Sequence, residues 1–170
     1  MQALHLITIG KLKGNFHYLQ PGIDDYIKRL KPWLPVSIIE IPDEPITATR
    51  SREQVLAKET ARLLSYVNKA PYVVSLSENG EQYGSERFSA EWFRRINGTN
   101  PPNGGISTPG SGPMIVIVGG PLGLSEEILQ RSDWVISLSA MTFPHPLVRL
   151  VFLEQLYRAY KIHRNEPYHK

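Results

Sequence analysis

The segment Met114–Val118, which reads Met-Ile-Val-Ile-Val, places the strongest constraint on how this chain can fold. A strand formed by this run has no polar side, so it must be covered on both of its faces. Such cover is typical of a central strand in a parallel sheet with helices on each side. The segment therefore predicts an α/β fold.

Short β-type runs alternate with helical segments along the rest of the chain, as expected for a largely parallel sheet with helices on both faces. The predicted strands cover residues 4–9, 36–41, 72–76, 114–118 and 134–137. The predicted helices cover residues 22–30, 51–67, 85–97, 125–131 and 147–163. With 170 residues and 41% apolar content, we expect a single domain, residues 1–170, with one core.

Two of the predicted helices carry additional information. Ser51 and Gln54 stand at the spacing of a capping box, so the helix at 51–67 is expected to begin there. The helix at 147–163 is apolar most of the way round, which predicts burial on two sides. One side would face the sheet, and the other could face a second subunit.

Residues 98–113 read Gly-Thr-Asn-Pro-Pro-Asn-Gly-Gly-Ile-Ser-Thr-Pro-Gly-Ser-Gly-Pro, and nine of these sixteen residues are glycine or proline. Neither a helix nor a strand persists in such a composition. We interpret the segment as a flexible surface insertion within the domain.

Composition excludes several kinds of site. The chain has no cysteine, which excludes disulfides, thiolate metal sites and cysteine nucleophiles. Its five histidines show no spacing typical of a metal site, so we expect no metal. The apolar run 3–9 lacks the basic leader of a signal peptide, and no stretch approaches the roughly 20 apolar residues that span a bilayer. We therefore expect a soluble, cytoplasmic protein; the formal charge of +3 is compatible with a polyanionic partner without selecting one.

A glycine-rich turn at residues 118–125, Val-Gly-Gly-Pro-Leu-Gly-Leu-Ser, is the first candidate site. It follows the all-apolar strand and leads into a helix for which Ser125 is the expected N-cap. Open α/β sheets bind ligands at the C-terminal ends of their strands, and glycine lets a ligand approach the backbone closely. The same glycines also suit a tight turn with no ligand, so the turn alone leaves both interpretations open.

The turn matches neither of the common phosphate-binding motifs. It lacks the Gly-Lys-Ser/Thr ending of a Walker loop and the GxGxxG spacing of a dinucleotide fingerprint. Glu126 and Glu127 at the start of the next helix would repel a pyrophosphate and favour a neutral or cationic ligand, such as a sulfonium cofactor.

A second candidate site, residues 136–146, follows the last predicted strand and reads Ile-Ser-Leu-Ser-Ala-Met-Thr-Phe-Pro-His-Pro. Its small residues expose backbone amides and carbonyls that can bind an adenine edge. Pro146 suits the first turn of the helix that follows. We interpret His145, between two prolines, as an exposed turn histidine and not as a catalytic group.

The C-terminal tail, residues 158–170, is the third candidate site. It holds four Lys or Arg, two His and two Tyr against one Glu, a mixture suited to phosphate contacts and base stacking. A structural alternative stays open, because Glu154 and Arg158 stand four residues apart and can simply pair on the surface of a helix.

Together the three sites resemble the ribosomal RNA large-subunit methyltransferase H family of the SPOUT superfamily. The similar segments are Gly-Gly-Pro-Leu-Gly at 119–123, Leu-Ser-Ala-Met-Thr-Phe-Pro-His-Pro-Leu-Val-Arg at 138–149, Glu-Gln-Leu-Tyr-Arg-Ala-Tyr at 154–160 and Pro-Tyr-His at 167–169. Leu-Ile-Thr-Ile-Gly-Lys at 6–11 and Glu-Ile-Pro at 40–42 extend the resemblance over essentially the whole chain. The insertion at 98–113 and the glycine-containing helix entry at 20–22 depart from the family pattern.

The resemblance implies a fold, an assembly and a cofactor. The implied fold is a SPOUT-type α/β fold whose C-terminal part passes through a trefoil knot, and the implied assembly is a homodimer. The implied cofactor is S-adenosyl-L-methionine. Carried over position by position, the family's cofactor contacts fall on Leu76, Gly119, Gly120, Leu138, Ser139, Ala140, Met141, Thr142 and Phe143.

The implied reaction transfers the cofactor's methyl group to N3 of a pseudouridine in large-subunit ribosomal RNA, on the assembled ribosome. It needs neither a metal nor a covalent intermediate, because the methyl group is already activated and must only be aligned with N3. The candidate catalytic residues lie in the tail: Tyr168 and His169 for the N3 proton, and Arg158 for an imide oxygen or a phosphate.

Two alternative functions are compatible with the same residues. One is a non-catalytic RNA- or ribosome-binding protein that keeps the basic tail. The other is a Rossmann-type nucleotide enzyme, which the missing fingerprint disfavours. Cofactor binding separates these alternatives from the methyltransferase.

Overall fold

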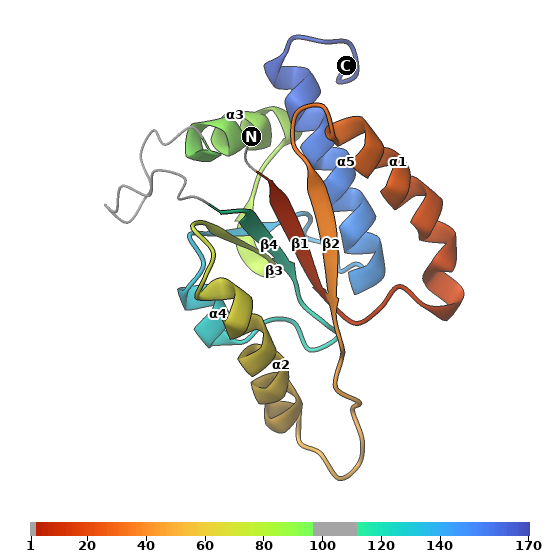
Figure 1. The fold of residues 1–170 in the computed structure, drawn as a ribbon, viewed down its shortest axis with the longest axis vertical. Helices are drawn as coiled ribbons and strands as arrows, with labels where there is room; N and C mark the ends of the chain where they lie inside the picture. Colours follow the sequence, from red (N-terminus) through yellow and green to blue (C-terminus); the bar gives the residue numbers. More distant parts are fainter. Residues whose placement is uncertain (1–2, 97–111) are drawn as a thin grey trace.

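The computed structural model describes residues 3–96 and 112–170, in which five strands form one parallel sheet of order β2-β1-β4-β3-β5 (Figure 1). Most of the insertion predicted at 98–113 lies outside the described residues. The strands are β1 (Leu4–Ile9), β2 (Val36–Ile41), β3 (Val73–Gln82), β4 (Met114–Val118) and β5 (Trp134–Ser137). The helices are the 3-10 helix η1 (Gly14–Leu19), then α1 (Gln20–Leu30), α2 (Arg52–Val67), α3 (Ser85–Ile96), α4 (Glu126–Gln130) and α5 (His145–His163).

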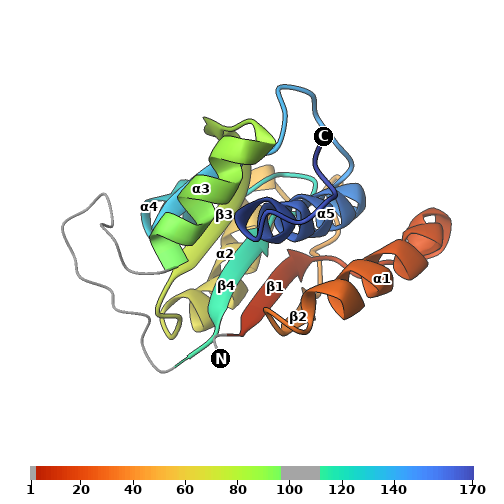
Figure 2. The ribbon, with the colours of Figure 1, turned by 90° about the horizontal axis from the view of Figure 1, so that it is seen from above.

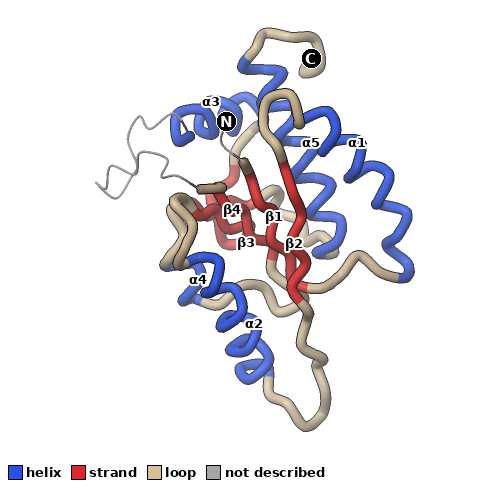
Figure 3. Tube along the Cα trace, in the orientation of Figure 1, coloured by secondary structure: helices blue, strands red, loops and turns tan. Residues whose placement is uncertain are grey.

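Helices cover both faces of the sheet. Helices α2 and α4 lie on one side of the strands, and α1, α3 and α5 lie on the other (Figures 1 and 3). Strand β4 divides its side chains accordingly: Met114, Val116 and Val118 pack into the core on the α5 side, while Ile115 and Ile117 pack into the core on the α2 side. All five residues of β4 are buried, as the all-apolar run predicts for a central strand.

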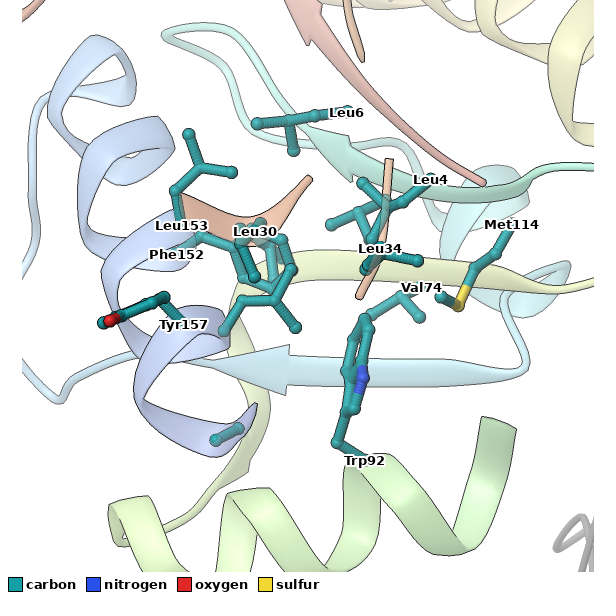
Figure 4. Close-up of a cluster of buried hydrophobic side chains, with 14 of the residues drawn as sticks. Leu4, Leu6, Leu30, Leu34, Val74, Trp92, Met114, Phe152, Leu153 and Tyr157 are labelled. Carbon is teal, nitrogen blue, oxygen red and sulfur yellow. The ribbon is translucent and has the colours of Figure 1, made fainter. Parts of the chain in front are cut away.

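The larger of the two cores lies on the α5 side (Figure 4). Phe152 and Leu153 of α5 meet Leu4 and Leu6 of β1 there. Trp92 of α3 closes one end of this core and is fully buried.

The local patterns predicted most element bounds correctly. Four strands agree with the prediction, and α2 begins after Ser51, whose hydroxyl accepts the Gln54 N–H at 3.2 Å while its own N–H donates to Gln54 Oε1 at 3.1 Å. This reciprocal pair is the expected capping box. Two features were missed: helix η1, and the continuation of β3 beyond Leu76 to Gln82 past a register shift.

Helix α5 lies between α1 and α3 (Figure 2). Most of the apolar surface around α5 is therefore buried within one chain. The sequence alone had left one side of this helix open for a second subunit. The contact with α1 is close, because a Cβ on Gly22 would lie 3.2 Å from Leu150 Cδ1. None of the helices in the described residues is long and apolar enough to cross a membrane.

Candidate functional site

A cavity of about 540 Å³ opens at the C-terminal ends of β4 and β5, beside the register shift that follows Leu76 in β3. These ends share one edge because the strands are parallel, and this edge is where open α/β sheets bind ligands. Val118, Ile136 and Leu138 give the cavity an apolar lining, and its volume is within the range of small-molecule sites.

The glycine turn forms one wall of this cavity. A Cβ on Gly119 would lie 2.7 Å from the carbonyl carbon of Gly123, so the turn closes on itself only with glycine at position 119. Gly123 has a φ of 77° and donates its N–H to the Gly120 carbonyl at 3.0 Å. The hydroxyl of Ser125, the N-cap of α4, accepts a hydrogen bond from the Thr60 hydroxyl of α2 at 2.7 Å. The first bond closes the turn on itself, and the second ties the C-terminal end of the turn to α2.

The segment after β5 forms the opposite wall. Ser137 donates its hydroxyl to the Ser139 carbonyl at 2.9 Å, and the Ser139 hydroxyl accepts the Met141 N–H at 2.9 Å. These local bonds hold the segment in an irregular path that leaves backbone groups available to a ligand. Met141 is the most exposed large apolar side chain in the described part of the chain, at 74%.

The structure brings eight of the nine predicted cofactor residues together on the cavity. The lining includes Leu76, Gly119, Gly120, Leu138, Ser139, Met141, Thr142 and Phe143. Ala140, the ninth, is exposed and lies outside the lining. Residues from β3, from the turn after β4 and from the segment after β5 therefore converge on one site.

Several lining residues were missed from the sequence. Arg52, the first residue of α2, reaches the cavity, as do Ser77, Glu78 and Asn79. The latter three lie within the register shift of β3 between Leu76 and Glu81. Gly80 could have indicated this irregularity in the sequence, because glycine inside a strand often marks a bulge. In the structure, a Cβ on Gly80 would lie 2.4 Å from the Ile136 carbonyl carbon.

His145 requires a correction. It is not an exposed turn residue: it begins α5, is partly buried and lines the cavity. Burial, followed by the positive charge of Arg149, lowers the pKa of its imidazole. The ring is therefore held toward its neutral form, although Asp43 opposes this shift.

Two other cavity residues carry charge, Arg52 and Glu78. Glu126 and Glu127 are exposed on the first turn of α4 and do not line the cavity, so the ligand charge inferred from them has no direct geometric basis. In the described residues, no group of three or more His, Asp or Glu side chains is placed to hold a metal ion.

Arg149 joins the cavity to the end of β1. It is 1% exposed and donates to Glu40 Oε1 and to the Gly10 carbonyl, both at 2.7 Å. Glu40 Oε1 also accepts the Leu12 N–H at 2.7 Å. The first turn of α5, which carries His145, is thereby fixed to the C-terminal ends of β1 and β2. The position of Arg149 at the end of the 138–149 segment gave no indication in the sequence that it pairs with Glu40.

The candidate catalytic residues Arg158, Tyr168 and His169 form a separate cluster. The Arg158 guanidinium pairs with Glu154, lies 4.8 Å from the Tyr168 ring centroid, and is 3.3 Å from His169 Nδ1. Tyr168 donates to Glu154 Oε1 at 3.1 Å and lies 3.0 Å from the Tyr26 hydroxyl. Burial, then the Tyr26 bond and the nearby Glu154 charge, raise the pKa of Tyr168. Its phenol therefore stays protonated, so of the two residues His169 remains the candidate proton acceptor.

This tail cluster does not reach the cavity of its own chain. None of its three candidate residues lines the cavity. Arg158 stands thirteen positions after His145 on α5, which places it roughly 20 Å further along the helix axis. Figure 1 shows the C-terminus beyond this far end of α5, at the opposite end of the molecule from the loop that precedes α2.

Comparisons with known proteins agree with this geometry. A family model described as "Predicted SPOUT methyltransferase" matches residues 2–169. Proteins named ribosomal RNA large subunit methyltransferase H from Bacillus thuringiensis and Bacillus anthracis are each 40% identical to the chain, covering 98% of it and 99% of their own length. A solved structure of a probable methyltransferase from Bordetella pertussis shares the fold, with a TM-score of 0.50, 9% identity and 93% of each chain covered.

Proposed function

The chain belongs to the ribosomal RNA large subunit methyltransferase H family of SPOUT methyltransferases, and from this premise we propose that it methylates N3 of a pseudouridine in large-subunit ribosomal RNA. The methyl donor is S-adenosyl-L-methionine, and the substrate is the assembled ribosome. The observation that carries the proposal is the convergence of eight predicted cofactor residues on one cavity at the strand ends.

The residues present fit this cofactor. Gly119 and Gly120 line the cavity without side chains, and glycine is required at both positions because a Cβ would clash with Gly123 or with Ile9. The apolar surface of Val118, Ile136 and Phe143 suits the faces of an adenine ring, and the 138–143 segment offers backbone groups to its edge. When bound, the cofactor supplies a methyl group on a positively charged sulfur.

The protein's part in the reaction is alignment and removal of one proton. The backbone walls of the cavity orient the methyl group, and N3 of the target must approach in line with it while its proton leaves. His169 is the candidate acceptor for that proton, because Tyr168 is held in its protonated form. Arg158 is the candidate contact for an imide oxygen or a phosphate.

The separation of tail and cavity favours a homodimer with shared sites. In one chain the tail residues lie too far along α5 to meet a nucleotide at the cavity, so the partner's tail must supply them. The N-terminal half of α5 offers some surface for this association, because Leu147 and Val151 are only partly buried. A monomer in light scattering would count against the shared site.

The proposal for the fold includes the trefoil knot. Strand β5 pairs with β3 at the sheet edge, yet α5 returns to lie between α1 and α3. Gly80 of β3 passes so close to Ile136 of β5 that no side chain fits between them. The family membership is the support for the threaded path, and the close packing of the β3 bulge on β5 is compatible with it.

The test is transfer of labelled methyl from S-adenosyl-L-methionine to intact ribosomes, separated subunits and free ribosomal RNA, followed by mapping of the modified nucleotide. The proposal expects label at N3 of a pseudouridine, with intact ribosomes as the best substrate. Cofactor binding with transfer to a different RNA would overturn the stated specificity. Absence of both binding and transfer would favour the non-catalytic RNA-binding alternative.

A further inference from the structure

Glu59 of α2 is a buried acid that the reaction as described above does not use. Glu59 is 2% exposed, and its Oε1 accepts the Glu44 N–H at 3.1 Å. Its Oε2 is buried and has no hydrogen-bond partner in the described part of the chain. An unsatisfied carboxyl oxygen in the interior is costly, so its retention calls for an explanation.

The unpartnered oxygen lies behind the glycine turn. A Cβ on Gly120 would lie 3.6 Å from Glu59 Oε2, whereas Gly120 itself lines the cavity and Glu59 does not. The bond from Thr60 to Ser125 fixes α2 to the far end of the same turn. Gly120 therefore separates the carboxyl from the cofactor cavity.

The charges around Glu59 leave it without a cation of its own. The loop before α2 brings Asp43 and Glu44, and α2 brings Arg62, which is already paired with Glu44. The glycine turn and β1 contribute the uncharged Gly120 and Ile9. Burial is the largest cause that raises the pKa of Glu59; the Glu44 N–H bond and Arg62 oppose this rise, and Asp43 and Glu44 add to it.

We propose that Glu59 is a buried counter-charge for the cofactor's sulfonium, in addition to the cavity-lining Glu78, and that its carboxyl loses a proton when the cationic cofactor enters the cavity. The proton passes to solvent. Methyl transfer converts the sulfonium to the neutral thioether of S-adenosyl-L-homocysteine, which removes the cation, and the carboxyl then regains a proton. Glu59 thereby favours the methyl-bearing cofactor over the spent one. This inference rests on the proposed function, because it requires S-adenosyl-L-methionine in the cavity.

The direction of the pH dependence follows from the raised pKa. Below that pKa the carboxyl is protonated, and binding of the cation must expel the proton. Above it the carboxylate is already present, and binding releases nothing. Affinity for S-adenosyl-L-methionine should therefore rise with pH through the raised pKa, with proton release greatest just below it. Affinity for S-adenosyl-L-homocysteine should stay nearly constant over the same range.

The experiment is isothermal titration calorimetry of the full-length protein in buffers of different ionisation enthalpy, from mildly acidic to neutral pH. We expect proton release with S-adenosyl-L-methionine and not with S-adenosyl-L-homocysteine. Glu59→Gln should remove the release and weaken S-adenosyl-L-methionine about tenfold, as expected for loss of one favourable charge interaction. The same substitution should change affinity for S-adenosyl-L-homocysteine by less than about twofold.

Glu53→Gln is the matched control, because it removes an exposed carboxylate from the same helix and should retain the proton release. Equal proton release with both cofactors, or release that persists in Glu59→Gln, would overturn the inference while leaving the methyltransferase intact. Absence of S-adenosyl-L-methionine binding to the wild-type protein would overturn the proposed function itself. If Glu59→Gln does not fold, His145→Gln decides the matter: release that persists in this variant supports the inference, and release that disappears would assign the proton to the cavity histidine and overturn it.

Discussion

At the scale of single residues, Gly119 and His169 represent the two separated parts of the site. Gly119 lines the cavity in a turn with no room for a side chain, and His169 belongs to the tail cluster. In the proposed function, Gly119 gives the cofactor cavity its shape and His169 is the candidate for proton removal. Substitutions at these residues should therefore affect different measured quantities.

Gly119→Ala should weaken S-adenosyl-L-methionine binding by more than about tenfold, because the added Cβ would lie 2.7 Å from the Gly123 backbone and displace the turn. Calorimetry measures the affinity, and a thermal melt checks that the variant folds. Gly84→Ala is the control, since a Cβ there meets nothing within 4 Å. Wild-type affinity in Gly119→Ala would show that the cavity is not the cofactor site.

His169→Ala should lower the turnover of methyl transfer, by about 10²-fold or more if the imidazole removes the proton, and should change cofactor affinity much less. Single-turnover kinetics and calorimetry give the two quantities separately. His17→Ala, on the exposed surface of η1, serves as the control. An unchanged rate in His169→Ala would remove this residue from the mechanism.

At the scale of elements, the cavity is built by the ends of strands and the starts of helices. The register shift of β3 brings residues 77–79 to it, and the first turn of α2 brings Arg52. Arg149 then fixes α5 to the ends of β1 and β2. The stability of these helix starts and strand ends therefore affects the shape of the cavity.

Ser51→Ala should destabilise the protein by about 1 kcal/mol, because it removes the side-chain acceptor of the α2 capping box. Chemical denaturation measures the free energy of unfolding. Ser51→Asp keeps an acceptor at the N-cap and should retain most of the stability. Equal stability of the alanine variant and the wild type would mean that the cap contributes nothing here.

At the scale of the whole molecule, one chain holds the cavity and the tail cluster at opposite ends of α5. A single copy therefore presents each half of the proposed site without the other. The shared-site homodimer that we propose would bring the halves together, and it makes a prediction that a site within one chain does not.

Mixing the Gly119→Ala and His169→Ala proteins should restore methyl transfer, although each homodimer alone is impaired. In a mixed dimer, one site combines an intact cavity with the partner's intact tail, so it should give about half the activity of a wild-type dimer, one working site of two. Co-expression with two different tags isolates the mixed dimer for the assay. Activity no higher than that of the separate variants would contradict the shared site.

The sequence by itself determined the element order, most element bounds and the strand ends that line the cavity. These features depend on neighbouring residues: the all-apolar run at Met114–Val118, the capping pair of Ser51 and Gln54, and glycines directly after a strand. In a parallel sheet the C-terminal strand ends must share one edge, so Gly119 and Leu138 could be placed together from the sequence, whereas Leu76 was added by the family resemblance.

Only the tertiary structure decided which distant residues meet. It placed Arg52 and His145 on the cavity, paired Arg149 with Glu40, left Glu59 Oε2 unpartnered behind the glycine turn, and put the tail at the far end of α5. Such contacts depend on the path of the chain between elements. Hydrophobic periodicity reports which face of an element is buried, but it carries no information about which partner buries it.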